Sequence, residues 1–234
     1  MPKICVLADS HAAALKRGWP LIEDDFPGTE LTFFAGTSTE WSNLRAADGK
    51  LVPTSKVLRG QFGRSAQGET EISGDFDAYL LCSIGLAISF ALKQWVRQEQ
   101  RDWPAHREAV ARQARHTNCA LVLAMLRKIT AKPVLLIAAP FQPRDYCLFS
   151  PAIDDDAAAK IRGDFFAECE ALAADHAATF LPQPKKTWAP NGVTTRMQFA
   201  SPELPDGRED RRHCTPRYGA IVLRAVLESG FGTN

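Results

Sequence analysis

The sequence predicts an α/β protein built around a five-stranded parallel sheet, and three observations favour this class. Five short apolar runs recur along the chain and alternate with longer stretches of helical pattern. The runs are almost continuously apolar, which is typical of strands whose two faces are both covered by helices. With 234 residues, 45% of them hydrophobic, the chain is long enough for one large domain with a substantial core. We therefore expect a single domain over residues 1–234.

The predicted strands are short apolar segments, each followed closely by polar residues, glycine or proline. In chain order they are Lys3–Ala8, Glu30–Ala35, Phe76–Ser83, Pro133–Ala139 and Thr179–Pro182.

The predicted helices lie between and after these strands. The first stops at Gly18, Pro104 suits the first turn of the third, and Thr215 is a suitable N-cap for the last. Their ranges are His11–Arg17, Ala87–Gln100, Pro104–Ile129, Asp154–Ala178 and Pro216–Glu228. Residues 36–74, which are polar and glycine-rich, and residues 183–214, which are rich in proline, are expected to be irregular. Such long loops are usually functional in a compact domain, so we expect the second to wall or cover a site.

Charge and composition exclude several classes of partner. A net charge of +1 gives no electrostatic reason to expect a nucleic acid. No run approaches the ~20 apolar residues of a membrane span, and the run at residues 4–8 is too short for the core of a secretory signal. The six cysteines are scattered without zinc spacing, which favours a reduced, cytoplasmic protein.

No cofactor or metal is expected either. A Gly-x-Gly-x-x-Gly motif is missing after the first strand, which argues against a dinucleotide-binding protein. Asp154, Asp155 and Asp156 are consecutive and do not share a face, so they suit a solvated helix start better than a metal site.

The unusual residues all follow predicted strands. Ser10 follows the first strand, Gly36 the second and Gly85 the third; residues 140–144 follow the fourth, and His213 ends the long loop after the fifth. The carboxyl ends of parallel strands lie at one edge of a sheet, which is where ligands bind in open α/β folds. The sequence therefore predicts a site at this edge.

Three residue types needed for nucleophilic catalysis occur among these positions. Ser10 lies at a strand-to-helix turn, where free N–H groups would stabilise an oxyanion, and His213 would be its base. The carboxylate that orients the histidine could come from Asp206, Glu209 or Asp210. Structural interpretations stand beside these: Ser10 as a helix N-cap and His213 as an ordinary loop histidine.

The neighbouring residues have two interpretations each. Asp9 is expected to tie the turn with hydrogen bonds, and His11 is either a surface helix residue or an auxiliary donor over the site. Gly36 and Gly85 either serve their turns alone or allow close approach of the backbone to a substrate.

Four motifs resemble, in order and spacing, the blocks of the SGNH (GDSL-type) hydrolase superfamily. They are Ala8-Asp9-Ser10, Phe34-Ala35-Gly36-Thr37, Ser83-Ile84-Gly85-Leu86-Ala87 and Asp210-Arg211-Arg212-His213. This resemblance implies a flavodoxin-like three-layer α/β/α sandwich and hydrolysis or transfer of acyl esters. It also selects Asp210 as the carboxylate, and it implies that the N–H groups of Ser10 and Gly36 hold the oxyanion. The Asp-Ser-His form of the first block resembles branches linked to bacterial polysaccharide modification.

The sequence departs from the family pattern at two positions. Ala8 replaces a glycine, and Ala87 replaces an asparagine that in the family donates a hydrogen bond to the oxyanion. Loss of one such donor typically costs about 10²–10³ in rate. Three explanations stand open: a shifted loop, a poor catalyst, or a substitute donor. The candidate donors are Asn43, Gln142, Asn191 and His11.

We therefore expect a serine esterase that acts on an O-acetylated glycan or a small acyl ester. An acyltransferase with the same residues, a non-catalytic glycan-binding protein and a nucleotide-binding flavodoxin-like protein are the alternatives.

Overall fold

The predicted fold class is confirmed by a computed structural model of the chain, which describes residues 1–98, 101–204 and 207–232. The central sheet has five strands, all parallel, in the order β2-β1-β6-β7-β8. Taken as successive strands of this sheet, the order is 2-1-3-4-5, which is the flavodoxin-like order. The strands are β1 Lys3–Ala8, β2 Glu30–Ala35, β6 Ala78–Cys82, β7 Val134–Ile137 and β8 Thr179–Phe180.

The strands end flush at one edge of the sheet. Ala8 pairs with Ala35 on one side and with Cys82 on the other, and Cys82 pairs with Ile137. The last residues of β1, β2, β6 and β7 therefore lie side by side, and the loops that follow them leave from the same edge.

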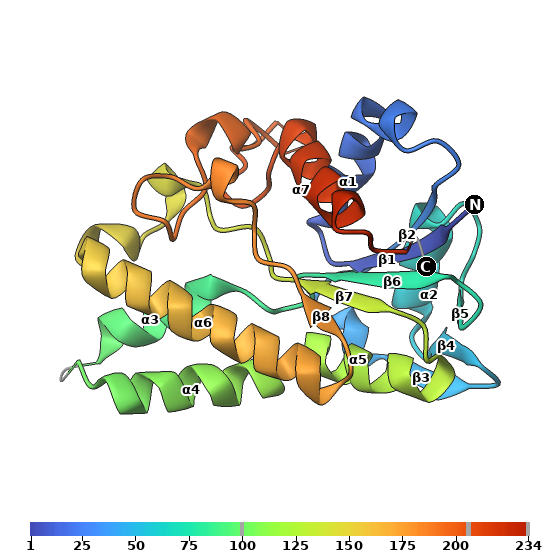
Figure 1. Cartoon of the computed structure of the whole chain (residues 1–234), viewed down its shortest axis with the longest axis horizontal. Coiled ribbons are helices and arrows are strands. Elements are labelled where there is room, and N and C mark those ends of the chain that lie inside the picture. The colour runs from blue at the N-terminus through green and yellow to red at the C-terminus, as the bar shows by residue number, and fades with distance from the viewer. Residues whose placement is uncertain (99–100, 205–206, 233–234) are drawn as a thin grey trace.

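Seven helices lie within the described residues and form layers on both faces of the sheet (Figure 1). Alternate residues of β1 show why: Cys5 and Leu7 pack into one core cluster, and Val6 and Ala8 pack into the other. Helices α1 and α7 cover the second cluster, and the remaining helices cover the first. The helices are α1 Ala12–Gly18, α2 Lys56–Ser65, α3 Ile88–Arg97, α4 Trp103–Arg115, α5 Asn118–Ile129, α6 Asp155–Asp175 and α7 Pro216–Glu228.

The prediction of one helix over Pro104–Ile129 is wrong, because the chain breaks between α4 and α5. Thr117 takes an extended conformation there, and its Oγ1 accepts a hydrogen bond from Ala120 N–H at 3.2 Å. The same hydroxyl donates to the Ala114 carbonyl at 2.8 Å, so it closes one helix and caps the next. The predicted end of the preceding helix, at Gln100, lies outside the described residues.

The prediction that residues 36–74 are irregular is also wrong. They contain α2 and a three-stranded antiparallel sheet of β3 Leu44–Ala47, β4 Lys50–Pro53 and β5 Ile72–Ser73. The strands have only two to four residues, too few to show a period in the sequence. The segment packs by its buried side chains Trp41, Leu51, Leu58, Phe62 and Ile72.

Residues 183–214 hold two short 3-10 turns, Lys185–Thr187 and Met197–Phe199, and otherwise isolated bridges among their described residues. All six cysteines are buried free thiols. Within the described ranges, we find no helix with the length and apolar character that crossing a bilayer requires.

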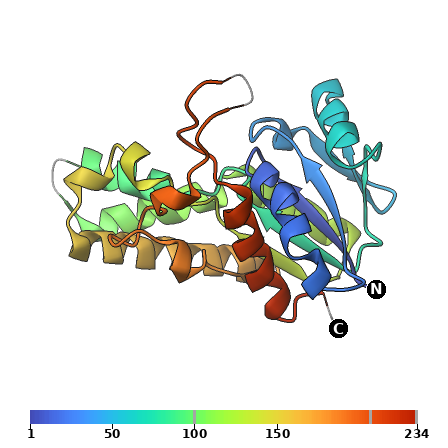
Figure 2. The ribbon, with the colours of Figure 1, turned by 90° about the horizontal axis from the view of Figure 1, so that it is seen from above.

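Helices α1 and α7 lie side by side and approach each other unusually closely (Figure 2). Glycines make this possible: a Cβ on Gly18 would lie 2.6 Å from the Pro216 carbonyl oxygen, and one on Gly219 would overlap the carbonyl oxygen of Ala14. Because α1 follows Ser10 and α7 follows His213, this contact brings the two candidate residues together.

We expect Gly219→Ala to destabilise the fold by about 2 kcal/mol or more, since the added methyl group forces two helix backbones apart. Urea unfolding measures this. Gly163→Ala is the matched control, because a Cβ at Gly163 of α6 meets nothing within 4 Å. The control should stabilise by roughly 0.5–1 kcal/mol through helix propensity. Equal behaviour of the two variants would show that the close approach is not a constraint.

Candidate active site

Ser10 lies on the turn between β1 and α1, and Asp9 holds that turn. The Asp9 side chain is buried; its Oδ1 accepts the His11 N–H at 3.1 Å and its Oδ2 accepts the Ser83 hydroxyl at 2.6 Å. Asp9 thus ties the turn after β1 to the turn after β6. The side-chain hydrogen bond of this turn comes from Asp9, and the hydroxyl of the exposed Ser10 bonds elsewhere.

His213 is held by two strands of loop that run antiparallel. The Ser201 N–H donates to the His213 carbonyl at 2.9 Å, and the Thr215 N–H donates to the Phe199 carbonyl at 2.9 Å. This hairpin-like segment projects from the sheet edge next to α7 (Figure 2). It carries the His213 side chain back toward the turn after β1.

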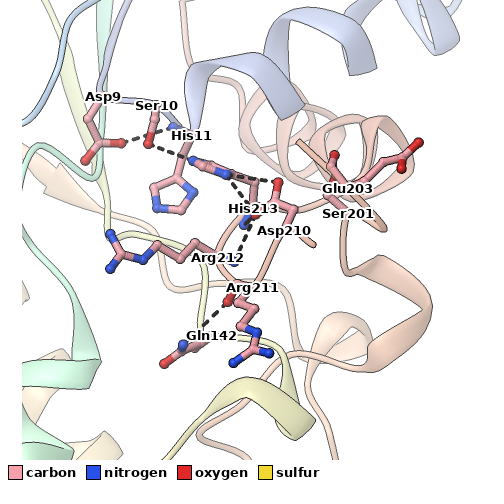
Figure 3. Close-up of polar contacts among 10 residues, drawn as sticks. All are labelled: Asp9, Ser10, His11, Gln142, Ser201, Glu203, Asp210, Arg211, Arg212 and His213. Atoms are coloured by element: carbon pink, nitrogen blue, oxygen red, sulfur yellow. Dashed lines mark hydrogen bonds and ion pairs between the residues drawn. The ribbon is translucent and has the colours of Figure 1, made fainter. Parts of the chain in front are cut away.

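Three predicted residues, Ser10, His213 and Asp210, meet in a hydrogen-bonded chain (Figure 3). Ser10 Oγ lies 2.8 Å from His213 Nε2, and His213 Nδ1 lies 3.0 Å from both carboxylate oxygens of Asp210. An ionised carboxylate only accepts hydrogen bonds, so the ring proton belongs on Nδ1. Nε2 is then an acceptor for the Ser10 hydroxyl. This arrangement allows Ser10 to pass its proton to His213.

Asp210 stays ionised although it is buried. Burial alone would raise the pKa of its carboxyl, but hydrogen bonds from the N–H groups of His213 and Arg212 outweigh burial and lower it. Glu209 instead turns to solvent and pairs with Arg211 at 2.8 Å. Asp206, the other carboxylate considered from the sequence, lies outside the described residues.

His11 lies against His213, with 5.3 Å between the ring centroids. Its Nδ1 is buried and has no hydrogen-bond partner in the described part of the chain. Burial lowers the pKa of His11 below its usual value, and the nearby His213 adds to this, while Asp9 opposes it. His11 is therefore a neutral imidazole beside the candidate base, and it is not an ordinary surface residue.

Gly36 lies beside Ser10, but its N–H is already used. It donates to the Ala8 carbonyl at 3.1 Å as the last hydrogen bond between β1 and β2. A Cβ at this position would lie 2.7 Å from Leu58 Cδ1, so any other residue would require the Leu58 side chain to move. The expected oxyanion donor is thus engaged within the sheet.

Gly85 belongs to a strained turn and lines neither the cavity of Ser10 nor the cavity of Arg212. Three consecutive residues, Ser83, Ile84 and Gly85, have positive φ angles of 69°, 46° and 84°. For the two residues that are not glycine, this costs on the order of 1–3 kcal/mol each. Gly85 faces residues of α4, and the turn delivers Ala87 to the N-cap of α3.

Two cavities open beside the three residues. The first, here called the Ser10 cavity, has a volume of about 320 Å³ and is lined by Ser10, Gly36, Gln61 and Arg64 among others. The second, the Arg212 cavity, has a volume of about 380 Å³ and is lined by His11, Ala87, Gln142 and Arg212 among others. Ser10 itself lines the first cavity, and its neighbour His11 and the neighbour of His213, Arg212, line the second.

Two of the four candidate donors considered for the position of Ala87 lie near it. Gln142 and His11 line the Arg212 cavity together with Ala87. Asn43 bonds Glu40 at 3.1 Å, and Asn191 caps its own loop through Val193 and Thr194, so neither faces the two cavities.

Gln61 and Arg64 also line the Ser10 cavity, although their sequence pattern did not identify them as site residues. Both belong to α2, within a segment expected to be irregular, and their spacing of three residues places them on one helix face. Recognition of a helix over Lys56–Ser65 would have placed these two side chains on one face.

The remaining reactive groups near the site carry no alternative chemistry. Cys214 is buried next to His213, and burial raises the pKa of its thiol to about 12. Asp154 caps α6 by accepting the Ala157 N–H at 2.7 Å. Among the residues that the structure describes, no three metal-ligating side chains gather in one place.

No family model matches the chain, and no curated protein matches it. Among solved structures, an extracellular lipase from Streptomyces rimosus is similar, with 14% identity, a TM-score of 0.53 and coverage of 96% of this chain and 99% of the lipase. The periplasmic domain of a lipopolysaccharide acetyltransferase from Salmonella ser. Paratyphi A has 12% identity, a TM-score of 0.48 and coverage of 97% and 82%. At this level of identity the likeness to the lipase is one of fold.

The neutral His11 predicts a specific dependence of stability on pH. The unfolded chain binds a proton at His11 below the usual pKa of about 6.5, whereas the folded chain resists it, so stability falls as the pH drops through this range. We expect His11→Gln to remove the part of this acid-induced loss of stability that comes from protonation of His11. Urea unfolding of both proteins between pH 8 and pH 5 tests it: the variant should gain stability relative to the wild type as the pH falls. Parallel curves would contradict a buried neutral His11.

Proposed function

We propose that this protein is a serine esterase or acyltransferase in which Ser10 is the nucleophile, His213 the general base and Asp210 the orienting carboxylate. The observation that carries the proposal is the 2.8 Å contact between Ser10 Oγ and His213 Nε2, with an ionised carboxylate bonded to the opposite ring nitrogen. A serine, an acceptor nitrogen and a carboxylate in this order form the arrangement that activates a hydroxyl.

The reaction proceeds in two halves. Ser10 Oγ attacks the ester carbonyl carbon while its proton moves to His213 Nε2, and Asp210 stabilises the imidazolium. The tetrahedral intermediate collapses, the bond to the alcohol oxygen breaks, and His213 gives its proton to that oxygen. Water then attacks the acyl-serine, its proton moves to His213, and the acid leaves as Ser10 regains the proton. A second alcohol in place of water makes the same steps an acyl transfer.

The oxyanion needs donors, and we assign two. One is the N–H of Ser10 itself, at the start of α1, where the helix dipole favours negative charge. The other is the side-chain amide of Gln61. Its Oε1 accepts the Thr37 N–H at 3.2 Å, which leaves Nε2 free to turn toward the Ser10 cavity that it lines. Gln61 would thus supply the donor that Ala87 lacks.

The substrate proposed is an O-acetylated glycan or a small acyl ester. Ser10 is exposed and lines an open cavity, so the walls of the site leave room for a bulky alcohol. The fold shared with a lipase is compatible with ester chemistry. A non-catalytic glycan-binding protein is the second candidate, and Ala87 is the observation that favours it.

We expect a fluorophosphonate probe to label the wild-type protein at Ser10, and 4-nitrophenyl acetate to be hydrolysed. Ser10→Ala should abolish labelling and lower turnover on the order of 10⁴-fold or more. Ser229→Ala is the control, since that serine bonds the Val226 carbonyl at the end of α7. Intact-protein mass spectrometry and initial rates give the two readouts. Turnover that survives Ser10→Ala, or a wild type that neither reacts nor is labelled, would refute the proposal.

Gln61 and Gln142 make a matched pair for the oxyanion assignment, because Gln61 lines the cavity that Ser10 lines and Gln142 lines the other. Gln61→Ala should lower kcat by about 10²–10³-fold with little change in KM, since the bond forms in the transition state. Gln142→Ala should change kcat far less. If Gln142→Ala is the slower enzyme, the oxyanion lies on the side of the Arg212 cavity and the assignment is wrong.

A further inference from the structure

The Arg212 cavity is lined by an exposed arginine that has no counter-ion among the described residues. The guanidinium of Arg212 forms no ion pair or side-chain hydrogen bond with any described residue. Its neighbour Arg211 pairs with Glu209 at 2.8 Å, and Figure 3 shows the two side chains pointing apart. The residues lining the cavity include no aspartate and no glutamate. The cavity therefore offers a positive charge that no described acidic side chain pairs with.

Further donors open onto the same space. Ser89 lines the cavity in the first turn of α3, whose N-cap residue Ala87 has no side-chain oxygen to bond the free N–H groups of that turn. Gln142 also lines the cavity, and its amide nitrogen donates to the Arg211 carbonyl at 3.4 Å. A guanidinium and helix N–H groups together favour an oxyanion, because both donate hydrogen bonds and present full or partial positive charge.

The cavity also has an apolar side. Leu148 is 85% exposed, and it lines the cavity together with Phe149. A group that binds here would place an anionic substituent at Arg212 and an apolar face against Leu148. A sugar ring with a carboxylate has this combination of surfaces.

The proposed reaction places the leaving alcohol on the side of His213. His213 must return its proton to the leaving alcohol oxygen, so the alcohol departs next to His213 Nε2. The His11 ring, 5.3 Å from the His213 ring, lines the Arg212 cavity. The acyl carbonyl, by contrast, belongs with Ser10, Gln61 and the Ser10 cavity. The alcohol therefore extends toward Arg212.

We propose that the Arg212 cavity is an anion subsite, and that the preferred substrate is an acyl ester whose alcohol carries a carboxylate, such as an acidic sugar. Arg212 holds the carboxylate through its paired N–H groups, a geometry that lysine does not reproduce. The proposal rests on the proposed esterase function and adds the class of alcohol to it.

The test uses three monoacetylated methyl glycosides that differ only at C6: a glucuronoside, a glucoside and a glucoside 6-phosphate. Acetate release gives kcat/KM for each, and 4-nitrophenyl acetate reports the basal activity. We expect the wild type to prefer the glucuronoside over the glucoside by about tenfold, the effect of one charge-assisted contact at a partly solvated site. A preference for the phosphate over both would replace the carboxylate by another oxyanion and overturn the class of alcohol proposed.

Arg212→Gln should abolish the preference for the glucuronoside. The preference is a ratio of two glycosides measured on the same variant, so any general change in activity, read from 4-nitrophenyl acetate, cancels from it. Arg212→Lys should restore only part of it, and Arg211→Gln is the matched control that should keep it. The preference should also shrink with added salt, because the contact is electrostatic.

Failures of the two proposals are distinguishable. A wild type inactive on 4-nitrophenyl acetate refutes the esterase itself. An active wild type without preference refutes only the anion subsite, and a preference lost in Arg64→Gln but kept in Arg212→Gln moves the carboxylate to the Ser10 cavity and overturns the assignment.

Discussion

The close contact between α1 and α7 is the constraint on which the candidate site depends. Ser10 lies two residues before α1 and His213 three residues before α7, so the distance between these side chains follows from how the two helices pack. Gly18 and Gly219 allow backbone to meet backbone, and a methyl group at either position would push the helices apart. A hydrogen bond of 2.8 Å tolerates little of such a shift. Close packing of α1 and α7 at Gly18 and Gly219 thus sets the distance between Ser10 and His213 at the edge of the sheet.

A second constraint fixes the other side of the site. The turn after β6 is wound through three left-handed residues, and the buried Ser83 hydroxyl bonds Asp9 in the turn after β1. Strain of this kind persists only where the surroundings hold it. Here two hydrogen bonds hold the turn: the Ser83 hydroxyl bonds Asp9, and the Ser83 N–H donates to the Ile137 carbonyl of β7. The turn that bears Ser10 and the start of α3 are therefore fixed relative to each other.

The sequence was sufficient for the central sheet because buried strands leave a strong signal: every residue of β6 is buried, and its letters are apolar throughout. The sequence was insufficient where tertiary contacts decide whether a segment forms a helix or a strand and where that element ends. Thr117 interrupts a helical pattern that continues on both sides of it, and the strands of the small sheet are too short to show alternation. Gln61 and Arg64 were missed because the helix that pairs them was missed. The choice among Asp206, Glu209 and Asp210 depended on the resemblance, since spacing alone does not report which carboxylate turns inward.

The charges around His213 are arranged so that this histidine can gain and lose a proton. Asp210 is ionised and bonded to His213, and Asp9 is bonded within the turns. His11 is kept neutral by burial, with His213 and Arg212 adding to the effect. In the proposed cycle His213 becomes positive, and a charged His11 at 5.3 Å would repel it and oppose that step. The positive charge of Arg212 would therefore act twice, once in keeping His11 neutral and once in attracting an anionic alcohol to the side on which His213 releases its proton.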